Sequence, residues 1–260
     1  VLTRHDERAA EYLRALDREI ALHERALGVR HRVTQLHFGG GTPTFLSDDE
    51  LSRLMAAIGL AFELAPDAEC SIEVDPRTAS RERLQHLAAL GFNRISFGVQ
   101  DFDPEVQQAV HRVQPFEQVE ALMNAAREIG FVSINVDLIY GLPKQQPENF
   151  ARTIARVIAI APDRIALYGY AHLPERFKPQ RRIVSADLPE GAARLAMLGQ
   201  AIAAFDGAGY DYIGMDHFAK PHDELAVAKR EGRLHRNFQG YTTQPECDLL
   251  GLGISTIGRI

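Results

Sequence analysis

Short apolar runs alternate with segments of helical periodicity along most of the chain, and this alternation restricts the fold more than any other feature. It is typical of βα units, in which each strand is followed by a helix that packs against a parallel sheet. The predicted strands cover residues 33–38, 70–74, 94–99, 133–138, 164–170 and 210–215. The predicted helices cover residues 8–25, 48–64, 80–90, 117–129, 148–160 and 189–208.

Capping residues and glycines mark the ends of several predicted helices. Ser47 and Glu50 form the pattern of a capping box at the start of the second helix. Gly91, Gly130 and Gly209 follow the ends of three other helices, where glycine commonly takes a left-handed conformation. Successive βα units of this kind form either a barrel or an open, doubly wound sheet. In both architectures, ligands bind at the carboxyl ends of the strands.

Length and charge narrow the classes of function. With 260 residues, 45% of them hydrophobic, the chain is long enough for one large α/β domain or two small ones. A formal net charge of −6 disfavours nucleic-acid binding, because a phosphate backbone requires a concentrated basic surface. We find no apolar signal segment and no uncharged stretch long enough to span a membrane. We therefore expect a cytoplasmic protein that binds neither nucleic acid nor a membrane.

The cysteines and histidines contain no metal-binding pattern. Cys70 and Cys247 are far apart in the sequence and belong to no CxxC or CxxxC spacing. The ten histidines form no HxxxH or HExxH pair. We therefore assign no metal ligand to this chain. The sequence leaves a disulfide open, but a cytoplasmic setting favours two separate thiols.

The first two predicted strands end in groups that suit ligand binding. The first ends in Gly39, Gly40 and Gly41, followed by Thr-Pro-Thr. Three glycines let a ligand approach the backbone closely, although a tight βα turn has the same composition. The second strand ends in Glu73, which could accept hydrogen bonds from ribose hydroxyls or could simply face solvent. Taken alone, each group leaves both interpretations open.

The next strand ends add further polar side chains. Gln100 and Asp101 follow the third strand, Asp137 ends the fourth, and Tyr168 and Tyr170 end the fifth. Each could be an ordinary surface residue. Their position at the same end of successive strands favours a shared site, because a polar ligand requires a ring of hydrogen-bonding groups around one mouth.

Three other groups are weaker candidates. Arg112 follows a further short helix that we predict after the third strand, and it could pair with a carboxylate ligand, although an exposed arginine at a helix end is the commoner case. A basic cluster after the fifth strand could receive an anionic substrate or could be a solvated loop. This cluster consists of Arg176, Lys178, Arg181 and Arg182. Three histidines lack ligand spacing and are assigned no role, namely His217, His222 and His235.

A series of motifs runs through nearly the whole chain, namely LHFGGGTPT, IEVDP, RISFGVQDF, VHRVQP, NVDLIYGLP, YGYAHLP, MDHFA and RNFQGYTT. Together they resemble the oxygen-independent coproporphyrinogen III oxidase family, a branch of the radical S-adenosylmethionine enzymes. GGGTPT and VDLIYGLP are shared with related heme chaperones. The last three motifs are more particular to the oxidases, and the chain is identified as a member of that branch.

The resemblance implies an α/β fold in the form of a partial, laterally open (β/α) barrel, with parallel strands alternating with helices. It also implies a 4Fe–4S cluster on a CxxxCxxC loop and two S-adenosylmethionine molecules. The implied reaction is oxidative decarboxylation of two propionates of coproporphyrinogen III to vinyl groups, giving protoporphyrinogen IX, through a 5′-deoxyadenosyl radical. The implied partners are this substrate and an electron donor such as flavodoxin or ferredoxin, and we expect a monomer.

The cofactor residues of the family map onto this chain through the matching motifs. The first S-adenosylmethionine would be contacted at its amino end, its ribose and an apolar surface by, respectively, Gly40, Glu73 and Ile257. The second would be lined by Gly41, Thr42, Gln100, Arg112, Asp137 and Ala171. The resemblance identifies no catalytic side chain in this sequence.

The chain departs from the family pattern because it contains no CxxxCxxC. We expect residues 1–260 to be an incomplete radical S-adenosylmethionine catalytic domain without the first strand, the cluster loop and the C-terminal helical domain, and inactive by themselves. The alternative within the same clan is a heme chaperone or another heme-handling radical protein. The alternative from a different class is a cofactor- or tetrapyrrole-binding protein without catalysis.

Overall fold

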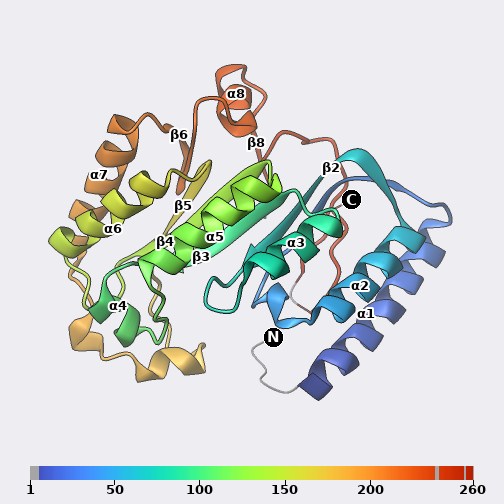
Figure 1. Ribbon diagram of the computed structural model, residues 1–260, viewed down its shortest axis with the longest axis horizontal. Coiled ribbons are helices and arrows are strands. Elements are labelled where there is room, and N and C mark those ends of the chain that lie inside the picture. Colours follow the sequence, from blue (N-terminus) through green and yellow to red (C-terminus); the bar gives the residue numbers. More distant parts are fainter. Residues whose placement is uncertain (1–5, 238–239, 255, 260) are drawn as a thin grey trace.

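The computed structural model describes residues 6–237, 240–254 and 256–259. Within these ranges, the central sheet has seven strands in the order β1-β2-β3-β4-β5-β7-β6 (Figure 1). The parallel strands are β1 (Arg32–Phe38), β2 (Glu63–Val74), β3 (Arg94–Gln100), β4 (Ser133–Tyr140) and β5 (Arg164–Gly169). Strand β7 (His217–Ala219) runs antiparallel to both β5 and β6 (Asp211–Gly214).

Helices connect the strands and lie along one face of the sheet (Figure 1). They are α2 (Asp48–Ala61), α3 (Arg81–Ala89), α5 (Phe116–Ile129), α6 (Pro147–Ile160) and α7 (Gly191–Gly207). Helix α1 (Asp6–Leu27) packs on the outer side of α2. The shorter elements are α4 (Pro104–Ala109), α8 (Glu224–Arg230), and the hairpin of β8 (His235–Asn237) and β9 (Gly240–Thr242).

The strands have one apolar and one polar face. In β3, Ile95, Phe97 and Val99 are at most 1% exposed, whereas Ser96 and Gly98 between them are half-buried. Side chains alternate across a strand, so the apolar set packs under the helices and the other set lies on the opposite face. We call this second surface of the curled sheet the open face. On this face the described strands can present polar groups to a ligand.

Two arginines and three carboxylates meet on the open face at the amino ends of the strands, and Arg94 lies 3.6 Å from one of them, Glu69 of β2. Arg94 of β3 and Arg164 of β5 both bind Glu224 of α8, at 2.8 and 2.7 Å respectively. Arg164 also binds Asp223, the N-cap residue of α8, at 2.8 Å. Because β4 separates β3 from β5, the shared carboxylate of Glu224 links strands that are not neighbours.

The predicted α/β class and the alternation of strands and helices are confirmed, but one strand is longer than predicted. Strand β2 begins at Glu63, directly after α2 ends at Ala61. The register of β2 against β1 skips between Leu64 and Glu69, and Pro66 lies in the skipped segment. A proline has no N–H for the ladder and is tolerated at such an irregularity. Because of the proline and the break in register, the sequence pattern did not indicate this half of the strand.

The last part of the sheet departs from the expectation of parallel strands throughout. Met215 and Asp216 alone connect β6 to β7. Two residues are too few for the crossover that parallel neighbours need, so the strands form an antiparallel hairpin. Strand β7, helix α8 and the β8–β9 hairpin occupy a polar stretch in which we predicted no element. Phe238 and Gln239 of the RNFQGYTT motif lie outside the described residues.

Both cysteines are free thiols, as we predicted. Cys70 is buried in β2 and Cys247 is exposed. Burial in the apolar core raises the pKa of the Cys70 thiol. Within the described ranges, none of the helices has both the length and the apolar character needed to cross a membrane.

A buried carboxylate joins the end of β3 to α6. Asp101 is 1% exposed and accepts hydrogen bonds from Asp103 N–H at 2.5 Å, Gln145 Nε2 at 2.6 Å and Thr153 Oγ1 at 2.8 Å. Gln145 is itself fully buried and also donates to the Ile139 carbonyl at 2.8 Å. The sequence placed Asp101 among the polar groups at the strand ends, but its side chain is committed to the α6 side of the fold.

We predict that Asp101→Asn lowers the free energy of unfolding by about 1–3 kcal/mol. The NH2 group of the asparagine is a hydrogen-bond donor, and it would face the donors that now bind the carboxylate. Urea denaturation followed by circular dichroism measures the change. Glu120→Gln on the exposed side of α5 is the control and should stay within about 0.5 kcal/mol of the wild type. Equal denaturation midpoints for Asp101→Asn and the control would contradict the structural role of Asp101.

Candidate functional site

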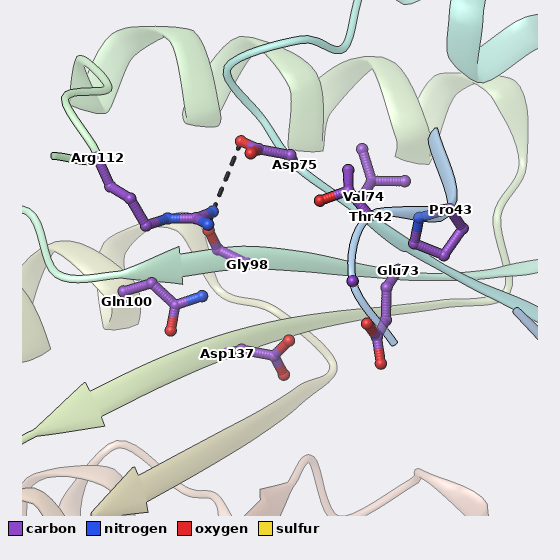
Figure 2. A pocket seen from close by; sticks show the side chains of 10 residues that line it. Thr42, Pro43, Glu73, Val74, Asp75, Gly98, Gln100, Arg112 and Asp137 are labelled. Atoms are coloured by element: carbon purple, nitrogen blue, oxygen red, sulfur yellow. Dashed lines mark hydrogen bonds and ion pairs between the residues drawn. The ribbon is translucent and has the colours of Figure 1, made fainter. Parts of the chain in front are cut away.

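Six of the predicted site residues border one cavity on the open face, at the carboxyl ends of β1 to β4 (Figure 2). The cavity measures about 90 Å³. Pockets that enclose a whole small molecule usually measure ~300–1,000 Å³, so this cavity accommodates one part of a larger ligand. Its lining consists of Gly41, Thr42, Pro43, Glu73, Val74, Asp75, Gly98, Gln100, Arg112 and Asp137.

The glycine turn after β1 places a backbone donor beside Glu73. Gly40 and Gly41 have φ values of 74° and 68°, in the left-handed region that favours glycine. The N–H of Gly40 donates to Glu73 Oε2 at 3.1 Å. A Cβ at Gly39 would lie 2.8 Å from Glu73 Oε1 and would also meet the ring of His37. Gly39 therefore leaves the space that these two side chains occupy, whereas Gly40 and Gly41 supply the left-handed conformation of the turn.

His37 is a neighbour of Glu73 that sequence reasoning missed. Its Nε2 lies 3.6 Å from Glu73 Oε1, and its Nδ1 lies 2.8 Å from Ser71 Oγ. The side chains of His37 and Glu73 are 42% and 40% exposed, so both remain accessible at the edge of the cavity. The alternation within β1, which puts His37 opposite Phe38, is the signal that could have assigned His37 to the open face.

Asp137 lies between two polar neighbours on the open face. Ser96 Oγ donates to its Oδ2 at 3.0 Å, and Asn135 Nδ2 donates to its Oδ1 at 2.7 Å. Burial raises the pKa of Asp137 to about 6, and the nearby charge of Glu73 acts in the same direction. The hydrogen bonds from Ser96 and Asn135 oppose the shift. Asp137 therefore takes up a proton at a higher pH than an exposed aspartate.

Gly98 lets two longer side chains cross the end of β3. The register between β3 and β4 shifts between Gly98 and Gln100, and Gln100 has a left-handed φ of 68°. A Cβ at Gly98 would lie 3.0 Å from Gln100 Nε2 and 3.4 Å from Arg112 Nη2. Any larger residue at position 98 would push one or both of these groups away from the strand.

Arg112 comes from the loop between α4 and α5 and turns back toward the sheet (Figure 2). Its Nη2 donates to the Gly98 carbonyl at 2.9 Å and lies 3.5 Å from Asp75 Oδ1. Its Nε is buried without a hydrogen-bond partner in the described part of the chain. Burial lowers the pKa of Arg112. With a side chain only 28% exposed, Arg112 is not the ordinary exposed arginine of a helix end.

Asp75 also lines the cavity, although we assigned it no role from the sequence. Its side chain is 7% exposed. Burial raises the pKa of Asp75, but hydrogen bonds from Arg77 and the charge of Arg112 outweigh burial, so the pKa lies below its ordinary value. Asp75 is therefore ionised at neutral pH. Only the short spacing between Asp75 and Arg77 indicates this pair in the sequence.

Three predicted site residues lie outside the lining of this cavity, namely Gly40, Ala171 and Ile257, although Gly40 donates a hydrogen bond to Glu73 of the lining. Ala171 is exposed after β5, and its carbonyl accepts a hydrogen bond from Gln180 Nε2 at 3.0 Å. Ile257 is 44% exposed in the C-terminal segment. Their contacts with a cofactor stay predictions. Tyr168 is 43% exposed, and burial together with the charges of Asp137 and Glu73 raises its pKa to about 12.

The basic cluster after β5 divides into two parts. Arg181 donates a hydrogen bond to the Pro174 carbonyl at 2.9 Å, and this contact within the loop stabilises its conformation. Arg176, Lys178 and Arg182 are exposed. Binding of an anionic ligand by these three side chains stays a prediction, while Arg181 supports the shape of the loop.

The fold and the site define a class. The sequence profile of the Radical SAM superfamily matches residues 5–157, and the chain belongs to that superfamily. Membership implies S-adenosylmethionine and a 4Fe–4S cluster as cofactors. In the part of the chain that the structure describes, no three His, Cys, Asp or Glu side chains are grouped to hold a metal ion.

Two of its relatives are oxygen-independent coproporphyrinogen III oxidases. The chain is 55% identical over 260 residues to the oxygen-independent coproporphyrinogen III oxidase of Escherichia coli and 53% identical to that of Pseudomonas aeruginosa. Each match covers all of this chain but 57% of the relative, so the chain spans less than two thirds of their length.

Two solved structures define the fold. The chain superposes on the Escherichia coli coproporphyrinogen III oxidase, described as a radical SAM enzyme, with a TM-score of 0.97 and 55% identity. That match covers 100% of this chain and 60% of the other, and it confirms the predicted partial barrel. The archaeal Elp3 of Methanocaldococcus infernus, at a TM-score of 0.53 and 16% identity over 73% of this chain, shares the fold alone.

The raised pKa of Asp137 predicts a pH dependence of stability. The folded state binds this proton with a pKa of about 6, against about 3.9 for an unfolded aspartate. The resulting stabilisation is complete below about pH 4 and is lost as the pH rises to about 6. We predict that the free energy of unfolding of the wild type falls by about 2–3 kcal/mol between about pH 4 and pH 7, relative to Asp137→Asn.

Urea denaturation at a series of pH values measures this difference. Asp67→Asn is the matched control, because the Asp67 side chain is 86% exposed. Its stability should follow the wild type at every pH. Parallel curves for the wild type and Asp137→Asn would show that the proton of Asp137 is not coupled to folding.

Proposed function

We propose that the protein to which this chain belongs is an oxygen-independent coproporphyrinogen III oxidase. It converts two propionate side chains of coproporphyrinogen III to vinyl groups and yields protoporphyrinogen IX. The supporting observation is that a chain similar along its whole length to such oxidases gathers polar groups at one mouth of the open face. We further propose that it is cytoplasmic and monomeric and receives electrons from a donor such as flavodoxin or ferredoxin.

The groups at the cavity fit S-adenosylmethionine, which carries an ammonium, a carboxylate and ribose hydroxyls. Glu73 and Asp137 are carboxylates that accept hydrogen bonds from ammonium and hydroxyl groups. Arg112 supplies a guanidinium whose buried Nε has no partner in the described residues and which can pair with a carboxylate. The cavity therefore offers donors and acceptors of the kinds that an amino acid and a ribose require.

We further propose that two molecules of S-adenosylmethionine bind in and beside this cavity. Gly40, Glu73 and Ile257 hold the first. The second is held by Gly41, Thr42, Gln100, Arg112, Asp137 and Ala171. We assign none of the described residues to the 4Fe–4S cluster, because they include no group of metal-ligating side chains.

The chain's own residues bind and orient, while the cofactor supplies the difficult chemistry. That chemistry is the removal of a hydrogen atom from the substrate propionate. For each propionate, one hydrogen atom passes to the cofactor, carbon dioxide leaves, and one electron passes to an external acceptor, so that one vinyl group remains. Gly40 N–H fixes the carboxylate of Glu73, and Ser96 and Asn135 fix that of Asp137. The exposed side chains of Arg176, Lys178 and Arg182 face the remaining carboxylates of the substrate.

The complete protein tests the proposed reaction. Prepared without oxygen and supplied with dithionite and S-adenosylmethionine, it should convert coproporphyrinogen III to protoporphyrinogen IX and release two molecules of carbon dioxide per substrate. Chromatography of the oxidised porphyrins measures both compounds. A heme chaperone would bind heme and leave coproporphyrinogen unchanged, and that result would replace the proposed oxidase by the alternative of the same clan.

The proposed role of Glu73 predicts a loss of cofactor affinity. Glu73→Ala should weaken the binding of S-adenosylmethionine to the complete protein by about 1.5–3 kcal/mol, because a charge-assisted hydrogen bond is lost. Equilibrium dialysis with labelled cofactor measures the affinity. Glu63→Ala, at the exposed start of the same strand, should bind as the wild type does. Unchanged affinity of Glu73→Ala would remove this residue from the site.

A further inference from the structure

We propose that Arg77 is a positioning residue for the cofactor site, which holds Arg112 in its binding orientation through Asp75 and through the backbone of His111. The inference rests on the proposed contact between Arg112 and the second S-adenosylmethionine. It assigns a function to a side chain that lies outside the cavity and does not touch the ligand itself.

Every nitrogen of the Arg77 guanidinium is committed to one of two acceptors. Nε donates to Asp75 Oδ1 at 2.9 Å, and Nη2 donates to Asp75 Oδ2 at 2.6 Å. Nη1 donates to the carbonyl of His111 at 3.1 Å. Such a planar fork binds a carboxylate with both arms, which a lysine cannot do. Arg77 therefore joins the end of β2 to the loop that carries Arg112.

The backbone that aims Arg112 is held in an unfavourable conformation. His111 has a φ of 56°, in the left-handed region that a side chain with a Cβ seldom adopts. The next residue is Arg112, whose N–H donates to the Gln107 carbonyl at 2.8 Å. Such a conformation persists only where surrounding contacts fix it. The hydrogen bond from Arg77 to the His111 carbonyl is one of these contacts.

The charges in this group leave Arg112 able to bind an anion. Asp75 Oδ1 lies 3.5 Å from Arg112 Nη2, but both oxygens of Asp75 already accept shorter hydrogen bonds from Arg77. One carboxylate thus serves two guanidinium groups, and one positive charge remains uncompensated among the three side chains. Arg77 satisfies Asp75, so Arg112 is anchored at Nη2 while its charge stays available to a carboxylate ligand.

A double-mutant cycle in the complete protein separates positioning from a general structural role. The four proteins are the wild type, Arg77→Ala, Arg112→Ala and the double variant, and the readout is binding of labelled S-adenosylmethionine in equilibrium dialysis without oxygen. Each single variant should raise the Kd of one of the two bound molecules about tenfold. The double variant should bind no more weakly than Arg112→Ala alone, because Arg77 acts only through Arg112.

Two further variants control for folding. Arg77→Lys keeps the charge but not the fork, so its Kd should lie between those of the wild type and Arg77→Ala, with an unchanged thermal midpoint. Arg81→Ala removes an exposed arginine bound to Glu128 at 2.7 Å and should leave the Kd unchanged.

Two results would overturn the inference. One would contradict only the role of Arg77, and the other would also contradict the role of Arg112. Multiplicative losses in the double variant, with a normal loss in Arg112→Ala, would overturn the role of Arg77 alone. Unchanged binding by Arg112→Ala would remove Arg112 from the cofactor site and the role of Arg77 with it.

Discussion

The rest of the structure depends on one constraint. Each parallel strand has one apolar and one polar face, and neighbouring strands pair with their apolar faces on the same side of the sheet. Ile95, Phe97 and Val99 must pack beneath the helices, and this requirement forces Ser96 and Gly98 onto the open face. The same rule acts on each neighbouring strand. Pairing Gly98 with Asp137 then places the polar groups of successive strands in adjacent positions. The site is thus a direct consequence of how the core packs.

The sequence predicted those site residues whose position follows from periodicity along a strand. Glu73, Gln100 and Asp137 were reached in this way, because a strand end can be read from apolar alternation and a following turn. The sequence identified Arg112 as a candidate, but it did not predict that this side chain is largely buried. Its orientation depends on Asp75 and Gly98, which belong to two other segments, and no local pattern reveals contacts between distant loops.

The elements that prediction missed are those whose stability comes from their surroundings. Strand β7 has three residues and is defined by pairing with β5 and β6 on either side. Helix α8 has seven residues and is held by Arg94 and Arg164 at its amino end. Neither element has enough length to produce a periodic signal of its own. The MDHFA motif could be recognised by resemblance, whereas its strand could not be derived.

The carboxylate that binds both Arg94 and Arg164 has a mechanical consequence for the whole sheet. The carboxylate of Glu224 connects β3 and β5 across β4, at the amino ends of these strands. A side chain of α8 thus joins β3 to β5 at the end of the sheet opposite the cavity.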